Sequence, residues 1–404
     1  MNHWYRSIIA ALTLMHGAVL PAGDWPCWRG PNHDGRSAES IDIDPVRKTG
    51  LLEKWKANVG TGFSSCVVSD GKVVTLGNSD EQDTIYCFDV TTGEAVWKFS
   101  YAAPLDDRDF EGGPTATPLI DAGQIFSLSR EGDVRCLKLE TGELVWERNL
   151  PESAQLRIPG WGFGGSPRLV NGMLLLTVGE SGVALDPADG SIRWASADKE
   201  SGYASPVVYR SMGKEFALFP SGRTYTAVVL SSGQVAWQQR WLVSFGCNAA
   251  DPIVDDGHMF LSSAYNRGCA LLRLTDSDPE MLWKNKDMQN HMNGCVLIDG
   301  FLYGAHGDLE AGSSLRCMNW STGAVAWTNE DIQPSAVIAS AKHLIVMTVD
   351  GQLLIGPASS SGFEVVHSQK VLEGRCWTVP VLSNGLLFCR NASGEFVCYS
   401  IATP

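Results

Sequence analysis

The stretch Thr141-Gly142-Glu143-Leu144-Val145-Trp146 is the clearest copy of a short phrase that recurs along the chain. In each regular copy a glycine stands four residues before a tryptophan, and neighbouring tryptophans are 43 (237 − 194) to 49 (146 − 97) residues apart. The other regular copies are Thr92-Gly93 to Trp97, Asp189-Gly190 to Trp194, Ser232-Gly233 to Trp237 and Thr322-Gly323 to Trp327, and Trp283 follows a degenerate copy. A period of that size indicates a repeat architecture.

Each phrase is the turn and the outgoing strand of a β-hairpin. Glycine supplies the positive φ that a tight turn needs, and the small polar residue before it tolerates the turn. A tryptophan fixed in every outgoing strand is expected to pack between neighbouring units, removing roughly 150–250 Å² from water and contributing about 4–6 kcal/mol. We therefore assign a packing role to Trp55, Trp97, Trp146, Trp194, Trp237, Trp283 and Trp327.

The rest of each unit predicts three further strands. Units open with a proline-containing segment such as Ser166-Pro167, followed by a hairpin turn such as Asn171-Gly172 and an apolar run such as Met173–Leu176. Four antiparallel strands in about 45 residues are typical of a propeller blade. With 42 glycines and only 19% charged residues, the composition also favours an all-β chain.

The two ends of the chain predict how the ring closes. Trp55 lies in a fourth strand that no first three strands precede, whereas Trp377–Tyr399 is three strands that no fourth follows. We expect the N-terminal strand to complete the C-terminal blade, so that the ring has no open edge. If His367 replaces tryptophan in one unit, the protein is an eight-bladed β-propeller. Rejecting the His367 unit leaves a seven-bladed alternative.

The segment before the ring predicts export. Ile8–Leu20 is largely apolar and leads to small residues, so we interpret residues 1–23 as a signal peptide, 24–50 as a strap and 51–404 as a single propeller domain. The apolar run is too short for a transmembrane helix, and we expect no such segment in the mature chain. We therefore expect a periplasmic or extracellular protein, and a monomer. Prolines and glycines exclude regular structure in the strap, which should lie on the body of the domain.

The repeat pattern Ala/Cys-x-Asp-x-x-Thr-Gly-x-x-x-Trp resembles the PQQ-type repeat. This is the blade of quinoprotein alcohol dehydrogenases and of BamB-like outer-membrane assembly propellers. The phrases Trp25-Pro26-Cys27-Trp28-Arg29-Gly30-Pro31, Asn248–Pro252, Asn290–Asn293 and Cys376–Pro380 are similar to those of secreted bacterial PQQ-binding-like propellers. The resemblance covers nearly the whole mature chain and is specific for the fold, but fold does not imply function.

The resemblance makes pyrroloquinoline quinone (PQQ) with Ca²⁺ a possible cofactor, held in the dehydrogenases over a disulfide between adjacent cysteines. This chain has no adjacent cysteines, no Cys-x-x-Cys-His and no His-Glu-x-x-His. The acidic run Asp106–Glu111 could supply oxygen ligands to Ca²⁺, although Arg108 inside it favours a solvated loop between blades. We assign no catalytic residue and no metal ligand.

One face of a propeller collects the loops between blades and those between second and third strands. Our candidates for ligand binding on that face are Arg157, Trp161, Arg223, Tyr225, Asn248, Asn266, Arg267, His291, His306, Arg375, Trp377 and Arg390, with Phe163, Asn293 and Asp308 nearby. Several arginines and aromatics suit an anionic or carbohydrate-like small ligand or an extended peptide. Equally, these side chains could hydrogen-bond the loops of a wide ring, and a structural role is likewise the alternative for Arg29 in the strap.

The cysteines predict mostly buried thiols. There are 11, an odd number. Cys87, Cys136, Cys317 and Cys398 occupy the repeat position filled elsewhere by alanine, which indicates a small buried slot. Cys247 and Cys269 are the candidates for a disulfide.

Charge and motifs together lead to two functional hypotheses. The net charge of −14 disfavours nucleic acid and anionic membrane surfaces as partners. The first hypothesis is an exported propeller that acts as a non-catalytic binding or protein-assembly module, with a protein partner or a small polar ligand on the channel face. The second is a PQQ-dependent oxidoreductase acting on alcohols or sugars.

Overall fold

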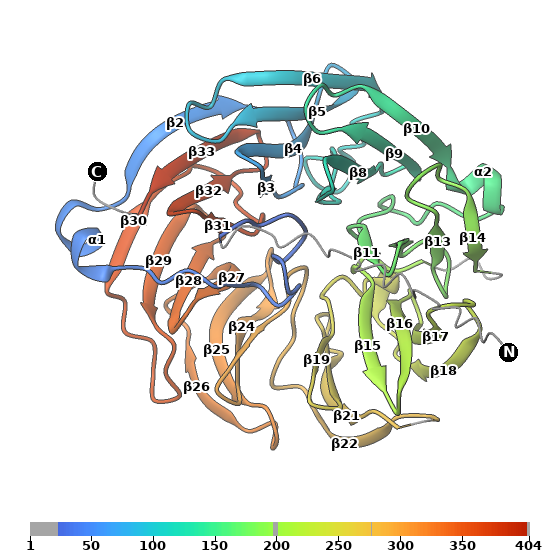
Figure 1. Cartoon of the computed structure of the whole chain (residues 1–404). Coiled ribbons are helices and arrows are strands. Elements are labelled where there is room, and N and C mark those ends of the chain that lie inside the picture. The colour runs from blue at the N-terminus through green and yellow to red at the C-terminus, as the bar shows by residue number, and fades with distance from the viewer. Residues whose placement is uncertain (1–22, 197–200, 276, 402–404) are drawn as a thin grey trace, which may run out of the picture.

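A computed structural model describes residues 23–196, 201–275 and 277–401, which form eight β-sheets arranged as blades around a central channel (Figure 1). The predicted eight-bladed propeller is confirmed, and the seven-bladed alternative is wrong. Apart from Gly23, the predicted signal peptide lies outside the described residues.

We number the blades in chain order, and within each blade the strands run from the channel outward. Blades 1 to 4 contain β3 (Val67–Ser69), β4 (Lys72–Ser79), β5 (Gln82–Asp89) and β6 (Ala95–Ala102); β7 (Leu119–Asp121), β8 (Gln124–Leu128), β9 (Asp133–Lys138) and β10 (Leu144–Asn149); β11 (Arg168–Val170), β12 (Met173–Leu176), β13 (Val183–Leu185) and β14 (Ile192–Ala195); and β15 (Val207–Ser211), β16 (Lys214–Pro220), β17 (Thr224–Val229) and β18 (Val235–Arg240).

Blades 5 to 8 follow the same plan around the other half of the ring. They contain β19 (Ile253–Asp255), β20 (His258–Ser263), β21 (Gly268–Arg273) and β22 (Glu280–Asn285); β23 (Val296–Ile298), β24 (Phe301–Asp308), β25 (Gly312–Asn319) and β26 (Val325–Asn329); β27 (Pro334–Ser340), β28 (His343–Thr348), β29 (Gln352–Pro357) and β30 (His367–Lys370); and β31 (Val381–Ser383), β32 (Leu386–Arg390), β33 (Glu395–Ser400) and β2 (Leu52–Asn58).

The ring closes as the sequence predicts. β2 is the outer strand of blade 8 and pairs antiparallel with β33, with Leu52 opposite Ser400 and Trp55 opposite Cys398. The last blade is therefore completed by a strand from the opposite end of the chain, and both edges of β33 are paired.

The repeated tryptophans lie where adjacent blades meet. The indole N–H of Trp97 in blade 1 donates to the Leu139 carbonyl of blade 2 at 2.8 Å. A Cβ on Gly142, whose φ is 70°, would stand 2.6 Å from that ring, so glycine is needed both for the turn and for the close approach. Trp55, Trp146, Trp194, Trp283 and Trp327 likewise donate to a carbonyl of the next blade.

Trp237 departs from this pattern. It precedes the degenerate copy of the phrase, and its indole donates instead to the Tyr209 hydroxyl of its own blade at 2.9 Å. Loss of the turn glycine in blade 5 thus coincides with loss of the inter-blade hydrogen bond.

The strap contains regular structure, so the prediction that it has none is wrong. It forms β1 (Arg36–Ser37), which pairs parallel with β27, and helix α1 (Ile43–Thr49). The Asp42 side chain caps the helix by accepting from the Asp44 amide at 3.1 Å. Pro45 is tolerated because it lies in the first turn, where an amide has no partner within the helix.

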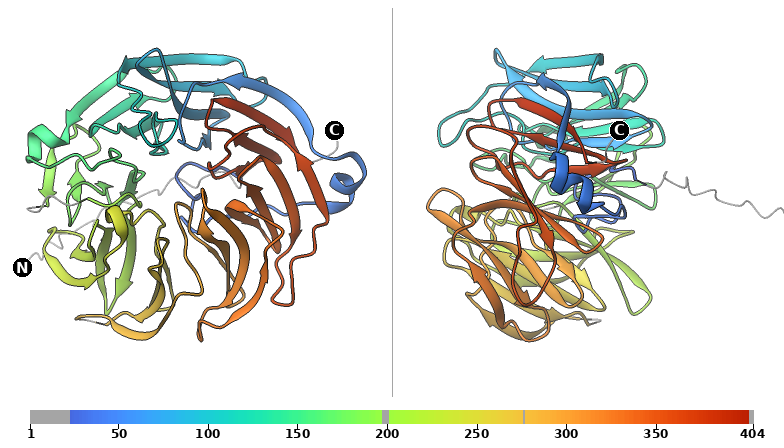
Figure 2. Two further views of the ribbon diagram at one scale, coloured as in Figure 1. Left: turned by 180° about the vertical axis from the view of Figure 1, so that it is seen from behind. Right: turned by 90° about the vertical axis from the view of Figure 1, so that its left-hand side faces the viewer.

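The first part of the strap enters the channel rather than lying on the outside of the body (Figure 1). Trp25 pairs with Val68 of β3 through two backbone hydrogen bonds, and the Ile120 amide of β7 donates to the Pro26 carbonyl. Figure 2 shows the same segment and α1 from behind and from the side. The strap therefore ties the inner strands of several blades together.

Few other elements interrupt the sheets. They are helix α2 (Leu150–Ala154) and the 3₁₀ turn η1 (Ser244–Gly246). In the described ranges, no helix has the length and apolar character needed to cross a membrane. All eleven cysteines lie in the described part of the chain and are free, so the suggested bridge between Cys247 and Cys269 is wrong.

Candidate binding site in the central channel

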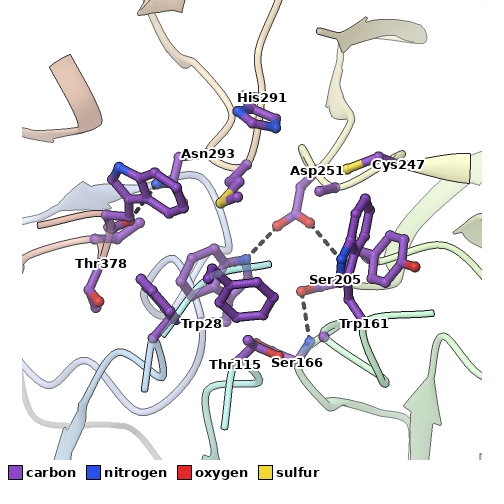
Figure 3. A pocket seen from close by; sticks show the side chains of 18 of the residues that line it. Trp28, Thr115, Trp161, Ser166, Ser205, Cys247, Asp251, His291, Asn293 and Thr378 are labelled. Carbon is purple, nitrogen blue, oxygen red and sulfur yellow. Dashed lines mark hydrogen bonds between the residues drawn. The ribbon is translucent and has the colours of Figure 1, made fainter. Parts of the chain in front are cut away.

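The strap and the loops between blades enclose a cavity of about 210 Å³, which we call the aromatic pocket (Figure 3). Trp28 of the strap contributes to its floor. Its lining consists of Trp28, Phe63, Asp109, Phe110, Thr115, Trp161, Gly164, Ser166, Tyr203, Ser205, Cys247, Ala249, Asp251, Tyr265, His291, Met292, Asn293, Glu310, Trp377, Thr378 and Val379.

Asp251 joins the floor to the wall. Its carboxylate accepts from the Trp28 indole at 2.6 Å and from the Ser205 amide at 2.8 Å. Burial raises the pKa of this carboxyl, while the charges of Arg29 and Arg168 act in the opposite direction. The carboxylate thus fixes the strap to the entry of blade 5.

The Asp251 contact is the end of a chain of equivalent hydrogen bonds. The side-chain oxygens of Thr117, Ser166 and Ser205 accept from the amides of Ser65, Thr117 and Ser166, at 2.9–3.0 Å. Each acceptor directly precedes the proline that opens its blade. The small polar residue before the proline therefore links one blade entry to the next, from blade 1 to blade 5.

Aromatic rings form the wall of the pocket. Phe63 lies 5.6 Å from Phe110 and 5.7 Å from Trp377, between ring centroids. On the other side, Trp161 lies 5.5 Å from Tyr203. These two groups of rings form two arcs of the wall. A hydrogen bond of 2.8 Å from the Trp161 indole to Asp109, the residue before Phe110, joins the arcs.

Phe245 bridges two rings of the pocket from outside its lining. It lies 6.0 Å from Trp161 and 5.6 Å from Tyr265, while 74% of the residue remains exposed. Its φ is 62°, a left-handed conformation that is a genuine outlier for a bulky residue. Phe245 therefore stands at the mouth of the pocket at a cost in backbone energy.

His291 closes the wall beside Tyr265. The hydroxyl of Tyr265 lies 2.9 Å from His291 Nε2, and the Leu309 amide donates to Nδ1 at 3.2 Å. Because Nδ1 accepts, the proton of the neutral ring lies on Nε2 and is donated to Tyr265. Burial lowers the pKa of His291, so the ring is neutral at pH 7.

The charged side chains that line the pocket are acidic. Of the described residues, the lining includes the carboxylates of Asp109, Asp251 and Glu310 but no lysine or arginine. Arg375, outside the lining, stands 4.2 Å from the Trp377 ring centroid and pairs with Glu111 at 3.2 Å and Glu310 at 3.6 Å. An anionic ligand in the pocket would therefore meet no basic side chain among the described lining residues.

The structure brings some sequence candidates together in the pocket. Trp161, His291 and Trp377 line it, Asn293 lies beside them, and Arg375 lies at its mouth. The Asn293 amide donates to the Trp377 carbonyl at 2.9 Å.

Other candidates are buried inside the blades. Arg390 is 2% exposed and donates to the carbonyls of Gly60, Ser64 and Leu76; burial lowers its pKa to about 10. Asn248 donates to Ser221 and Trp241 carbonyls. For Arg390, Asn248 and the fully buried Tyr225, the structure places the side chain away from the pocket.

The remaining candidates lie outside the pocket lining. Arg267 stacks 3.7 Å from the Trp241 centroid, and Asn266 accepts from Lys286. Burial and Arg316 lower the pKa of His306 to about 4. Arg157 and Arg223 are exposed.

Sequence reasoning missed several pocket residues, namely Trp28, Phe63, Phe110, Tyr203 and Tyr265. Each is an aromatic in the strap or in a loop of the channel face. The aromatic content of those loops was the available signal, whereas the arginines drew attention to an anionic ligand.

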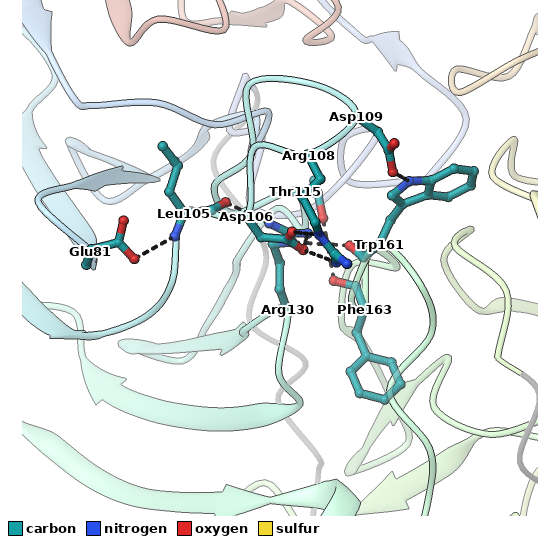
Figure 4. A network of polar contacts seen from close by, with 9 residues as sticks. All are labelled: Glu81, Leu105, Asp106, Arg108, Asp109, Thr115, Arg130, Trp161 and Phe163. Atoms are coloured by element: carbon teal, nitrogen blue, oxygen red, sulfur yellow. Dashed lines mark hydrogen bonds and ion pairs between the residues drawn. The ribbon is translucent and has the colours of Figure 1, made fainter.

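The acidic loop at Asp106 is an ion-pair network (Figure 4). Asp106 accepts from Arg108 at 2.5 Å and from Arg130 at 2.7 Å, and these contacts lower its pKa. Asp109 accepts from Trp161. Among residues 23–196, 201–275 and 277–401, no group of three or more His, Cys, Asp or Glu side chains could hold a metal ion.

The pocket does not fit PQQ. That cofactor is a planar tricyclic tricarboxylate, and the described lining would oppose its charges with three carboxylates and no cation. Both oxygens of Asp251 already accept hydrogen bonds from Trp28 and Ser205. The described lining therefore offers PQQ no suitable site.

Comparison with known proteins places the chain among similar propellers. The family described as "Outer membrane protein assembly factor BamB" matches residues 81–329. The outer membrane protein assembly factor BamB of Yersinia pestis is 22% identical over 372 residues, covering 86% of this chain and 88% of that protein.

Two solved structures share the fold. BamB from Moraxella catarrhalis superposes with a TM-score of 0.64 at 15% identity, covering 87% of this chain and 99% of its own. The quinohemoprotein alcohol dehydrogenase from Comamonas testosteroni superposes with a TM-score of 0.68 at 13% identity, covering 95% of this chain and 81% of its own. At these identities the likeness shows the architecture alone.

Proposed function

Because this chain belongs to the family of the outer membrane protein assembly factor BamB, we propose that it is an exported, non-catalytic module that binds other proteins during their assembly. The binding surface is the face of the ring on which the aromatic pocket opens. The role in outer-membrane protein assembly for which the relatives are named supports this proposal, and so does the arrangement of Phe245.

Phe245 is the observation that carries the proposal. A large aromatic side chain that is 74% exposed contributes little buried apolar area to the fold, and its φ of 62° costs backbone energy. Exposed aromatics at positions of this kind are typical anchors of protein interfaces. A partner that covered the ring would recover the apolar burial that the free protein lacks.

The distribution of other exposed apolar residues supports the same face. Most lie on the outermost strands of the blades, as Val96, Leu144 and Val235 do. Ile158 and Leu242, at 43% and 46% exposure, instead lie in loops between blades, the latter three residues before Phe245. Both therefore add exposed apolar surface to inter-blade loops that also carry the pocket residues Trp161 and Cys247.

Site-specific photocrosslinking in the source organism tests the proposal. A benzophenone amino acid replaces Phe245 in one variant and Met212 in the other. Met212 is the matched control, because it is 78% exposed but lies in the turn between β15 and β16, away from the channel-face loops.

We expect a discrete protein adduct from position 245 and none from position 212. The adduct should disappear when Leu242 and Ile158 are both replaced by serine, with the melting temperature unchanged. Equal crosslinking from both positions, or none from position 245, would contradict a partner surface at the pocket mouth.

The alternative is a PQQ-dependent oxidoreductase acting on alcohols or sugars. Purified protein incubated with PQQ and Ca²⁺ should not reduce an artificial electron acceptor in the presence of these substrates. If the protein bound PQQ stoichiometrically and turned over substrate, and if Asp251→Asn abolished that turnover, the oxidoreductase would become the favoured proposal.

A further inference from the structure

We propose that the aromatic pocket binds an organic monocation of about the size of a trimethylammonium or guanidinium group. This goes beyond the proposed function, because a free small cation would use the pocket whether or not a protein covers its mouth. The inference rests on the ring geometry, the charge and the volume of the cavity.

The geometry surrounds the ligand with π faces and edges. One arc consists of Phe63 with Phe110 and Trp377 on its two sides, at centroid distances of 5.6 and 5.7 Å from Phe63. Trp161 and Tyr203 form part of the other arc. A cation within about 6 Å of a ring centroid is attracted by the ring quadrupole, and several rings act together in an aromatic cage. Because rings from both arcs line the cavity, a group bound in it is surrounded by aromatic side chains.

The charge of the pocket selects the sign of the ligand. Asp109, Asp251 and Glu310 line the cavity, and His291 is neutral at pH 7. Arg29 and Arg168 partly balance Asp251, and Arg375 is shared between Glu111 and Glu310. With −14 on the whole chain, the field also draws cations toward the protein.

The hydrogen bonds of the pocket favour a poorly hydrated cation over a sugar. Asp109 and Asp251 are engaged by indole N–H groups, and the Ser166 and Ser205 hydroxyl oxygens accept backbone amides. These four groups are partly committed to the protein itself, whereas Thr378 Oγ1 in the lining has no hydrogen-bond partner. A trimethylammonium or guanidinium group needs mainly π surface and diffuse negative charge.

The volume sets the size of the ligand. About 210 Å³ is somewhat larger than a cavity of about 150 Å³ that accepts benzene, and smaller than the ~300–1,000 Å³ of pockets for drug-sized ligands. One cationic head group with a short chain fits that range.

Calorimetric titration of the full mature protein tests the proposal with a matched pair of probes. Choline carries the cation, and 3,3-dimethylbutan-1-ol has the same shape without the charge. We expect choline to bind at one site with at least about tenfold higher affinity than the neutral alcohol. Equal affinity for the pair, or no binding of choline, would overturn the proposal, as would preferential binding of glucose.

Variants locate the binding and separate its causes. Trp161→Leu should weaken choline about tenfold and the neutral alcohol less, because the π face is lost whereas part of the apolar surface is kept. Phe110→Leu provides the same test if Trp161→Leu fails to fold. Glu310→Gln should weaken choline severalfold at low salt, whereas Glu140→Gln, which removes an exposed carboxylate outside the pocket, should not.

The source of the cation is distinguished by two further probes, Nα-acetyl-arginine amide and Nα-acetyl-lysine amide. Tighter binding of the arginine derivative than of choline would assign the pocket to a basic side chain of a peptide, and the reverse order to a free quaternary ammonium compound. Binding of either class with crosslinking absent at position 245 would retain the cation site and reject the protein-docking proposal.

Discussion

At the scale of single residues, the hydroxyl chain before the blade-opening prolines explains why Asp251 is where it is. Thr117, Ser166 and Ser205 each accept one amide from the preceding blade, and Asp251 accepts the last. A carboxylate has a second oxygen to offer, and the Trp28 indole uses it. One residue thus continues the inter-blade chain and anchors the strap.

A second residue of the strap, His33, makes stability depend on pH. Burial, followed by the charge of Arg168, lowers its pKa from 6.5 to about 3. The folded pKa lies below the unfolded one, so the stabilisation is full above about pH 6.5 and is lost as the pH falls toward 3. Between pH 6.5 and 5 the loss is about 2 kcal/mol.

His33→Gln should remove this dependence. Denaturant unfolding at pH 7 and pH 5 measures it, and the parent should lose about 2 kcal/mol more than the variant over that interval. Identical pH dependence of the two proteins would show that His33 is as easily protonated in the folded state as in the unfolded chain.

The sequence predicted residue positions in the repeat better than side-chain directions. The register confirms that Cys136 and Ala184 occupy equivalent places, opposite Trp146 and Trp194. Leu271 stands at that place in blade 5, so the slot is not uniformly small. The position of Arg390 at the end of a strand beside a loop made it as reasonable a candidate for ligand binding as Trp161. Its side chain is instead buried, because the direction of a side chain depends on tertiary packing, which a local sequence pattern does not record.

At the scale of elements, β2 is the piece on which the last blade depends. It covers the outer edge of β33, and Trp55 packs against Phe88, Phe388 and Phe396 at centroid distances of 5.5–6.0 Å. The sequence predicted this closure because a lone fourth strand near the N-terminus and three strands near the C-terminus together make one four-stranded blade. Helix α1 was missed because Pro45 and the short length of the segment hide a weak helical signal.

Deleting residues 51–58 should destabilise the whole domain. The deletion leaves β33 with an unpaired edge and removes the Trp55 ring from the junction of blades 8 and 1. Calorimetry should show a large fall in melting temperature or loss of a cooperative transition. Replacing residues 43–49 by a Gly/Ser linker of equal length is the control and should cost less, because β2 stays paired; equal melting of the deletion and the parent would refute the closure role.

At the scale of the whole molecule, both ends of the described chain lie at one turn of blade 8. The Ser383 hydroxyl donates to the Gly23 carbonyl at 2.6 Å, and the Ile401 amide donates to the Gly385 carbonyl at 3.1 Å. The ring has near eightfold repetition, so the position of the break in the chain is not fixed by packing alone.

A circular permutant tests that independence. A short Gly/Ser linker joins Ile401 to Gly23, and new ends open between Met212 and Gly213, in an exposed turn. We expect a folded propeller whose melting temperature lies within about 10 °C of the parent. A permutant opened inside β8, between Ile125 and Phe126, is the control that should not fold; failure of the first permutant would show that the native break is required.

The pairing of β2 with β33 also sets a timetable for biogenesis. Leu52 and Ser400 are partners 348 (400 − 52) residues apart, and at about 5–20 residues per second the ribosome needs roughly 20–70 s to make the chain between them. Throughout that interval β2 lacks its partner β33, and contacts of such long sequence separation form slowly. Blade 8 therefore cannot be completed until β33 has been made, and until then the edge of β2 that β33 covers stays unpaired and open to pairing with other chains.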